Sequence, residues 1–333
     1  MKMVVISSPK LESGKTTIAA LIARLVLKEE KVFYGELLLK NRKQSESFPK
    51  ELLGKNSEFV DLSDISFENS DLSDNDTKIQ ADNFFNKCRK NLPGKSSEGL
   101  FIVEFGFKDM QILEDHDGSQ MQCVSVLPYD NIFCDIDKLK EVLKNISAKN
   151  IVINKVPKYR VKTLDQIISK LKDKIQNIVI IPDYDCFSSL TIGEIAKGLN
   201  AEWILGEGND DVLIRNFLIG GNPMDKAVDY FDRIKDKAVI ARADRPDIQM
   251  ASLETQTKCL ILTGGNDPIE YVQHEAEKNG VVVLKVNYDT SQTVSQLEEI
   301  IESSNTLHKE KIDEFVQEIS ISNNSALFEK LLS

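Results

Sequence analysis

Short runs of apolar, β-branched residues alternate with stretches of helical periodicity along most of the chain. In its first 200 residues these runs predict strands at 3–7, 31–34, 100–104, 122–126, 150–154 and 177–181. Several runs are apolar nearly throughout, which is typical of parallel strands covered by helices on both faces. Helices are expected between them, at 16–27, 77–89, 136–146 and 162–174. The alternation predicts an α/β fold with a mainly parallel sheet.

A second, smaller set of elements begins near residue 201. It comprises expected strands at 238–241, 259–262 and 281–286, and expected helices at 267–279 and 293–303. An amphipathic helix is predicted at 307–319, with Ile312 and Phe315 on its apolar side. We therefore expect two domains, at residues 1–200 and 201–333, the second a smaller α/β domain with C-terminal helices.

Composition narrows the classes of partner. The chain has 53 acidic and 42 basic residues, a formal net charge of -11, so its field repels nucleic acid and anionic membranes. The apolar N-terminal stretch is too short for a signal peptide or a membrane span, and we expect a cytoplasmic protein. The five cysteines are scattered, with no CxxC pair, which favours buried thiols over disulfides or zinc.

The clearest chemical motif follows the first expected strand. Residues 8–17 run Ser-Pro-Lys-Leu-Glu-Ser-Gly-Lys-Thr-Thr and lead into a helix. This is the context of a phosphate-binding loop, in which backbone N–H groups of residues 13–17 face phosphate, Lys15 reaches the β and γ oxygens, and the Thr16 hydroxyl ligates Mg²⁺. Gly14 allows the backbone to pass close to phosphate. The alternative is a plain strand-to-helix turn with a surface lysine.

Three departures or additions accompany this motif. Pro9 and Glu12 stand where glycine is usual, so we expect a weakened affinity for the nucleotide. Lys10 lies where deviant Walker ATPases carry a lysine that reaches the partner subunit's nucleotide. A solvated loop lysine is the competing interpretation.

Two later strands end in polar residues. Glu104 follows the run Leu-Phe-Ile-Val and is expected near Mg²⁺, directly or through water, because the carboxyl ends of parallel strands meet at one edge. Asn154 ends the next such run, and its amide can pair with a nucleotide base. The alternatives are a solvent-facing strand-end glutamate and a turn-forming asparagine.

These motifs together resemble a known arrangement. The order of motifs resembles the dethiobiotin-synthetase-like domain at the N-terminus of long phosphate acetyltransferases, followed by a DRTGG domain. The residues that carry the resemblance lie at 8–16, 103–104, 154–156, 181–183, 191–196, 201–207, 243–247, 261–265 and 286–290. In the second domain the signature residues are Asp244, Arg245, Thr263, Gly264 and Gly265. The resemblance covers almost the whole chain.

The resemblance implies a regulatory or accessory protein that binds ATP or GTP with Mg²⁺. A small-molecule effector, a homodimer and a separate phosphate acetyltransferase catalytic subunit are expected partners. Acetyl transfer is not expected, since the residues after Ile319 reach only a helical connector. The alternative is an ATP-dependent carboxylate-activating synthetase of the dethiobiotin or cobyrinate amide type. Glu36 stands where that family has its substrate lysine, and Lys40, Arg42 or Lys43 would have to substitute for it. A partner-driven ATPase switch that uses Lys10 is a third hypothesis, and whether nucleotide is hydrolysed stays open.

The paired glycines of the second domain have two interpretations. Gly264 and Gly265 join a strand to a helix, with an Asx residue as the expected N-cap and Pro268 in the first turn. This geometry suits an anion site, or it allows close packing against a neighbour. Asp244 and Arg245 are expected either to pair with each other or to reach across an interface. A homodimer through this domain would cover the apolar residues Ile312, Phe315 and Leu331, whereas in a monomer the terminal helices fold back on their own domain.

Overall fold

A computed structural model describes most of the strands and the helices that flank them. The described residues are 2–8, 13–26, 31–37, 52, 57–60, 62, 86–88, 90–91, 99–105, 121–130, 133, 138–139, 150–169, 177–221, 227–304 and 306–321. Lys10, Cys134, His116, Leu331, the polar stretch 68–76 and most of the expected helices 77–89 and 136–146 lie outside them.

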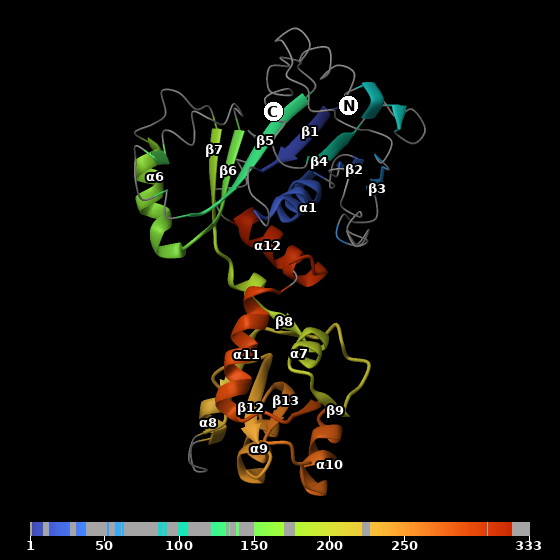
Figure 1. Cartoon of the computed structure of the whole chain (residues 1–333), viewed down its shortest axis with the longest axis vertical. Helices are drawn as coiled ribbons and strands as arrows, with labels where there is room; N and C mark the ends of the chain where they lie inside the picture. The colour runs from blue at the N-terminus through green and yellow to red at the C-terminus, as the bar shows by residue number, and fades with distance from the viewer. Residues whose placement is uncertain are drawn as a thin grey trace. The chain divides into compact units, whose positions relative to one another are not determined.

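The chain divides into two compact units (Figure 1). Unit 1 comprises residues 1–184 together with 306–333, and unit 2 comprises residues 185–305. This division differs from the expected boundary at residue 200, and it assigns the last helix to the first unit. The chain therefore leaves unit 1 after Tyr184 and returns to it at Thr306.

Unit 1 is built on a seven-stranded sheet in the order β3-β2-β4-β1-β5-β6-β7. Every pair of neighbouring strands in it is parallel, as the apolar runs predict. The strands are β1 (Lys2–Ser7), β2 (Val32–Leu37), β3 (Ser57–Phe59), β4 (Leu100–Phe105), β5 (Met121–Pro128), β6 (Asn150–Val156) and β7 (Asn177–Pro182). The described helices are α1 (Lys15–Val26), α6 (Val161–Ser169) after a short 3-10 turn (Lys158–Arg160), and α12 (Lys309–Ile321).

Helix α12 packs on α1 (Figure 1). Its apolar side is buried, with Ile312, Phe315 and Ile319 fully covered, and the Phe315 ring meets that of Tyr184 edge to face at 5.2 Å. On the rim, Arg24 Nη2 of α1 lies 2.9 Å from Asp313 Oδ1. The predicted amphipathic helix is present, but Ile312 and Phe315 find their cover inside unit 1 and not in a second copy of the chain.

Unit 2 contains a five-stranded sheet in the order β11-β12-β13-β14-β9. Strands β11 to β14 are parallel, and β9 pairs antiparallel with β14. These strands are β9 (Glu202–Leu205), β11 (Asn216–Ile219), β12 (Lys237–Arg242), β13 (Thr257–Thr263) and β14 (Val282–Val286), and β8 (Leu190–Thr191) pairs with β10 (Leu213–Ile214). The helices are α7 (Ile192–Gly198), α8 (Ala227–Phe231), α9 (Pro246–Leu253), α10 (Glu270–Lys278) and α11 (Thr290–Glu302), after a 3-10 turn (Asp185–Ser188).

Helices cover both faces of this smaller sheet. Residues of α8, α9 and α10 share one apolar cluster with β12 and β13, whereas residues of α7 and α11 share the other. Local sequence fixes two helix starts: Thr191 with Glu194, and Asp289 with Gln292, form reciprocal capping boxes. The resulting unit is an α/β layer with a core on each side of the sheet.

Two further findings come from the described residues. Cys88, Cys186 and Cys259 are buried, as predicted, whereas Cys123 is half-buried. Within that part of the chain, no helix is long and apolar enough to cross a membrane.

Candidate functional site

The phosphate loop leaves the sheet at its centre. Strand β1 lies between β4 and β5, and the chain passes from β1 through residues 8–14 into α1. Gly14 has a positive φ of 85°, and the Ile18 N–H donates to its carbonyl at 3.0 Å. The N-terminus of α1 therefore opens at the carboxyl edge of the sheet, where ligands of open α/β sheets bind.

Asn154 supports this loop from the end of β6. It is buried, and its Nδ2 donates to the Ser13 carbonyl at 3.0 Å. A Cβ on Gly14 would stand 2.3 Å from the same Nδ2, so Gly14 must be glycine both for its φ and for this contact. The amide of Asn154 therefore contacts the loop itself, and its pairing with a base stays a prediction.

Glu104 is the central acidic group of the site. It is the next-to-last residue of β4, is 4% exposed, and each of its carboxylate oxygens accepts a hydroxyl hydrogen bond. Thr16 Oγ1 donates to Oε2 at 2.9 Å, and Tyr34 OH donates to Oε1 at 2.7 Å. The phosphate loop and two strands thus meet on one carboxylate, and Glu104 is not the solvent-facing strand end of the alternative interpretation.

Burial dominates the electrostatics of this group. The pKa of Glu104 is raised to about 7. Desolvation is the largest cause, the hydrogen bonds from Tyr34 and Thr16 act against it, and the nearby charge of Glu36 adds to it. Burial, followed by the charge of Glu104, raises the pKa of Tyr34 far above its ordinary value, so its hydroxyl remains a donor. Lys15 is close enough to favour the ionised carboxylate.

The side chains at the loop suit a magnesium nucleotide. Thr16 and Glu104 supply hard oxygen atoms, which Mg²⁺ prefers, and Mg²⁺ commonly binds through one or two protein groups plus phosphate oxygens and water. No group of three His, Cys, Asp or Glu side chains gathers within the described ranges to bind a metal alone. Among the residues that the structure describes, none forms a hydrogen bond with the buried Ser13 Oγ, so this hydroxyl suits a phosphate oxygen.

Sequence reasoning missed Tyr34. Glu36 pairs in register with Glu104 on adjacent parallel strands, and Tyr34 lies two residues before it on the same face of β2. The available signal is a hydroxyl-bearing residue in an apolar strand next to a carboxylate. Thr17, the last residue of the predicted loop, is buried, and its Oγ1 lies 3.3 Å from Thr306 Oγ1.

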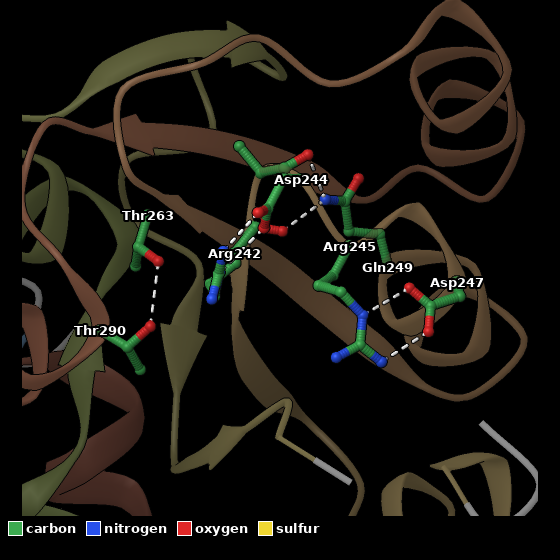
Figure 2. Close-up of polar contacts among 8 residues, drawn as sticks. Arg242, Asp244, Arg245, Asp247, Gln249, Thr263 and Thr290 are labelled. Atoms are coloured by element: carbon green, nitrogen blue, oxygen red, sulfur yellow. Dashed lines mark hydrogen bonds and ion pairs between the residues drawn. The ribbon is translucent and has the colours of Figure 1, made fainter. Parts of the chain in front are cut away.

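In unit 2 the Asp-Arg signature makes two separate ion pairs (Figure 2). Asp244 accepts from Arg242, including a 2.9 Å bond from Nε, and Arg245 Nε and Nη2 donate to the two oxygens of Asp247 at 2.9 and 2.6 Å. Of the two alternatives for Asp244 and Arg245, pairing with each other is not what the structure has, because each pairs with a residue two positions away, and a reach across an interface stays a prediction. The guanidinium beside each aspartate lowers the pKa of Asp244 and of Asp247.

The Thr-Gly-Gly signature connects neighbouring strand ends. Thr263 Oγ1 lies 3.1 Å from Thr290 Oγ1 (Figure 2). Gly264 and Gly265 have positive φ of 93° and 74°, and their N–H groups donate to the carbonyls of Tyr288 and Val286. A Cβ on Gly265 would stand 2.9 Å from the Asn287 side chain. These contacts lie between two loops of one unit, so the anion site and the packing of the glycines against a neighbouring subunit or domain both stay predictions.

The predicted cap of the following helix is wrong. Helix α10 begins at Glu270 with Ile269 as its N-cap, and no side chain caps it. Asp267 instead binds Lys285 of β14 at 2.7 Å, and Lys285 also binds Glu202 at 2.8 Å. Asp267, which the sequence predicts at the helix start, therefore forms an ion pair between the loop after β13 and strand β14.

The carboxyl edge of this sheet contains a topological switch point. The loop after β13 leads to α10 on one face, and the loop after β14 leads to α11 on the other. In open α/β sheets, ligands bind in the crevice between two such diverging loops. The Thr263–Thr290 contact joins the end of β13 to the start of α11.

The comparisons with known proteins agree with this division. Residues 194–300 match the DRTGG domain family. They form a DRTGG domain. The match falls within unit 2, residues 185–305, and it confirms the predicted DRTGG resemblance.

One curated relative confirms the wider resemblance. A phosphate acetyltransferase of Nitratidesulfovibrio vulgaris is 28% identical over 180 residues, which cover 50% of this chain and 25% of the relative. The chain therefore matches about a quarter of the length of that enzyme. The similarity to dethiobiotin synthetase stays a prediction.

Two of the solved structures that match are each aligned over about half of this chain. The CBS and DRTGG domains of the regulatory region of Clostridium perfringens pyrophosphatase, complexed with the activator diadenosine tetraphosphate, are 18% identical, with a TM-score of 0.30 over 56% of this chain and 76% of that one. The MinD cell division protein of Aquifex aeolicus is also 18% identical, with a TM-score of 0.32 over 55% and 83% of the two chains.

Proposed function

We propose that this chain is a nucleotide-responsive regulatory or accessory protein, with a triphosphate site in unit 1 and an effector site in its DRTGG domain. The observation that carries the proposal is the contact of Thr16 with the buried Glu104 at the start of α1. It puts the loop hydroxyl and a carboxylate side by side at a helix N-terminus, as Mg²⁺ and phosphate require. Lys15 would bind the β and γ phosphates, Ser13 and Thr17 would line the loop, and Lys10 stays a candidate beside them.

Calorimetry tests this proposal directly. Wild type, Lys15→Ala and Lys162→Ala are titrated with ATP and with GTP in the presence of Mg²⁺. Lys162 is exposed on α6 and is not part of the phosphate-loop sequence, so it serves as the control. We expect binding by wild type and by the control, and a loss of at least about 100-fold in Lys15→Ala, since a charge-assisted phosphate contact disappears. Wild type that binds neither nucleotide at millimolar concentration contradicts the proposal.

We further propose that the DRTGG domain takes an anionic small-molecule effector at its switch point. The support is the convergence of the β12, β13 and β14 ends there, with Arg242 and Arg245 exposed enough to exchange their aspartate partners for a ligand. A thermal-shift panel of nucleotides and central metabolites, read on wild type and Arg245→Ala, tests it. Stabilisation of wild type alone supports the site, and equal stabilisation of both excludes Arg245 from it.

The proposed partner is a phosphate acetyltransferase catalytic subunit, and we propose no acetyl transfer by this chain. The similarity to that enzyme over half of this chain supports the pairing. Acetyl phosphate formation from acetyl-CoA and phosphate should be absent with purified protein. Turnover that survives several columns contradicts this.

We also propose a homodimer through unit 2. Ile312 and Phe315 do not support it, because they are already buried within unit 1. The support is that Ile269 and Tyr271, close in sequence to the glycine loop, are exposed. Light scattering of the full chain at tens of micromolar tests it, and a monomer mass contradicts it.

A further inference from the structure

Tyr34 touches the site from the interior of the protein. It lies in β2, its side chain is fully buried, and its hydroxyl donates to Glu104 Oε1 at 2.7 Å. Glu104 Oε2 accepts from Thr16 at 2.9 Å. Neither the phosphate loop nor the Asp-Arg and Thr-Gly-Gly signatures include this tyrosine.

Strand register fixes the contact. Tyr34 pairs with Ile102 on β4, and Glu104 lies two residues further along the same strand. Since residues two apart on a strand share a face, Tyr34 and Glu104 lie on one face of neighbouring strands. The tyrosine position is therefore set by the sheet and not by a loop.

The Tyr34 hydroxyl restricts the rotation of the Glu104 carboxylate. The last torsion of a glutamate is broad and would allow the carboxylate to rotate around a single contact. Donors on both oxygens fix its plane. With Glu104 so oriented, the Thr16 hydroxyl donates its one proton to Oε2. The lone pairs of Thr16 Oγ1 can then bind another partner.

We propose that Tyr34 is a positioning residue for the divalent cation of the bound nucleotide, acting through Glu104 on the orientation of the Thr16 hydroxyl. The inference rests on the proposed nucleotide site. It adds a residue from β2 to that site. Tyr34 itself does not contact nucleotide or cation in this arrangement.

The test measures separately how a Tyr34 variant affects the binding of the cation and the binding of the nucleotide. Wild type, Tyr34→Phe and the control Tyr159→Phe, whose side chain is 80% exposed, are titrated with ATP in EDTA and in excess Mg²⁺. We expect Tyr34→Phe to bind ATP in EDTA within about twofold of wild type and to lose about tenfold of the strengthening that Mg²⁺ gives, since one hydrogen bond to a charged group is lost. Electron paramagnetic resonance of Mn²⁺ with ATP should show a matching loss of bound ion.

A double variant tests the route through Glu104. In a Glu104→Gln background, Tyr34→Phe should change the Mg²⁺ effect by less than about twofold. Equal losses in EDTA and in Mg²⁺, an unchanged Mn²⁺ signal, or a Tyr34→Phe protein that does not fold each overturn the inference, the last because the hydroxyl then serves the core alone. Wild type that binds no nucleotide contradicts the proposed function, and this inference with it.

Discussion

In each unit the signature residues lie at the carboxyl edge of that unit's own sheet, but the contacts that these residues make differ between the units. In unit 1 the contacts are buried or part-buried and join residues far apart in the sequence, such as Thr16 with Glu104 and Asn154 with Ser13. In unit 2 the Asp-Arg residues pair two positions away, and their side chains are exposed or part-exposed. Exposed local pairs contribute little to stability, whereas a buried carboxylate needs its partners. The charged signature of unit 2 is therefore better suited to exchange partners than to hold the fold.

The largest effect on stability is expected from a change in α12, which belongs to unit 1. Phe315→Ala should destabilise unit 1 by about 3–5 kcal/mol, because it leaves a cavity between α12, α1 and Tyr184. Trp203, the single tryptophan, lies in unit 2 and reports on that unit alone, so its fluorescence transition should not move. Circular dichroism follows both units.

Ile321→Ala is the matched control for that variant. Ile321 ends the same helix but is 79% exposed, and its loss should change stability by less than about 0.5 kcal/mol. If Phe315→Ala shifts the Trp203 transition as much as the circular dichroism, the units do not unfold separately.

The next largest effect on stability is expected in unit 2, at the buried residue Lys237. Lys237 is fully buried at the start of β12, and its Nζ has no hydrogen-bond partner in the part of the chain that the structure describes. Burial lowers the pKa of Lys237, against the opposing charges of Asp232 and Asp236. Lys237→Met should raise the melting temperature followed by Trp203 by several degrees, since it removes an unpaired polar group.

The lowered pKa of Lys237 also predicts how the stability of unit 2 changes with pH. Between the lowered pKa of folded Lys237 and its ordinary value, the unfolded chain binds the proton and the folded chain does not. Stability of wild-type unit 2 should therefore rise with pH in that window, and the rise should be smaller in Lys237→Met. Lys258→Met, which removes a more exposed partner of Asp236, is the control and should leave the slope in place.

A smaller effect is expected at the capping box of α7. Thr191→Ala should cost about 1 kcal/mol in urea unfolding followed by Trp203, because the Glu194 N–H loses its acceptor. Ser295→Ala, on the exposed side of α11, should be close to neutral. A neutral Thr191→Ala would show that tertiary packing alone sets the start of α7.

The smallest effect on stability is expected at Arg245. Its pair with Asp247 is part-exposed, so Arg245→Ala should leave the Trp203 transition unchanged within error. A large loss of stability would mean that the Asp-Arg signature of unit 2 is structural, as the buried contacts of unit 1 are.

Much of the fold was predictable from local pattern. The apolar runs give β1, β4, β6 and β7 within a few residues, and the glycine-lysine-threonine motif gives the start of α1. The order of strands in the sheet was not predictable, and the pairing of β2 with β4 is what brings Tyr34 to Glu104. Amphipathic spacing predicts α12 but does not state which helix it packs on. The sequence pattern thus identified the carboxylate and the loop but not the contacts that join them.

The return of the chain at Thr306 makes the DRTGG domain an insertion within the first domain rather than an addition to its end. A protein that stops at residue 305 would keep every residue of the DRTGG match and the phosphate loop, yet it would expose the side of α1 that α12 covers. Expression plasmids for a separate nucleotide-binding domain should therefore join residues 1–184 to 306–333 through a short linker, whereas residues 185–305 can be cloned as one continuous segment.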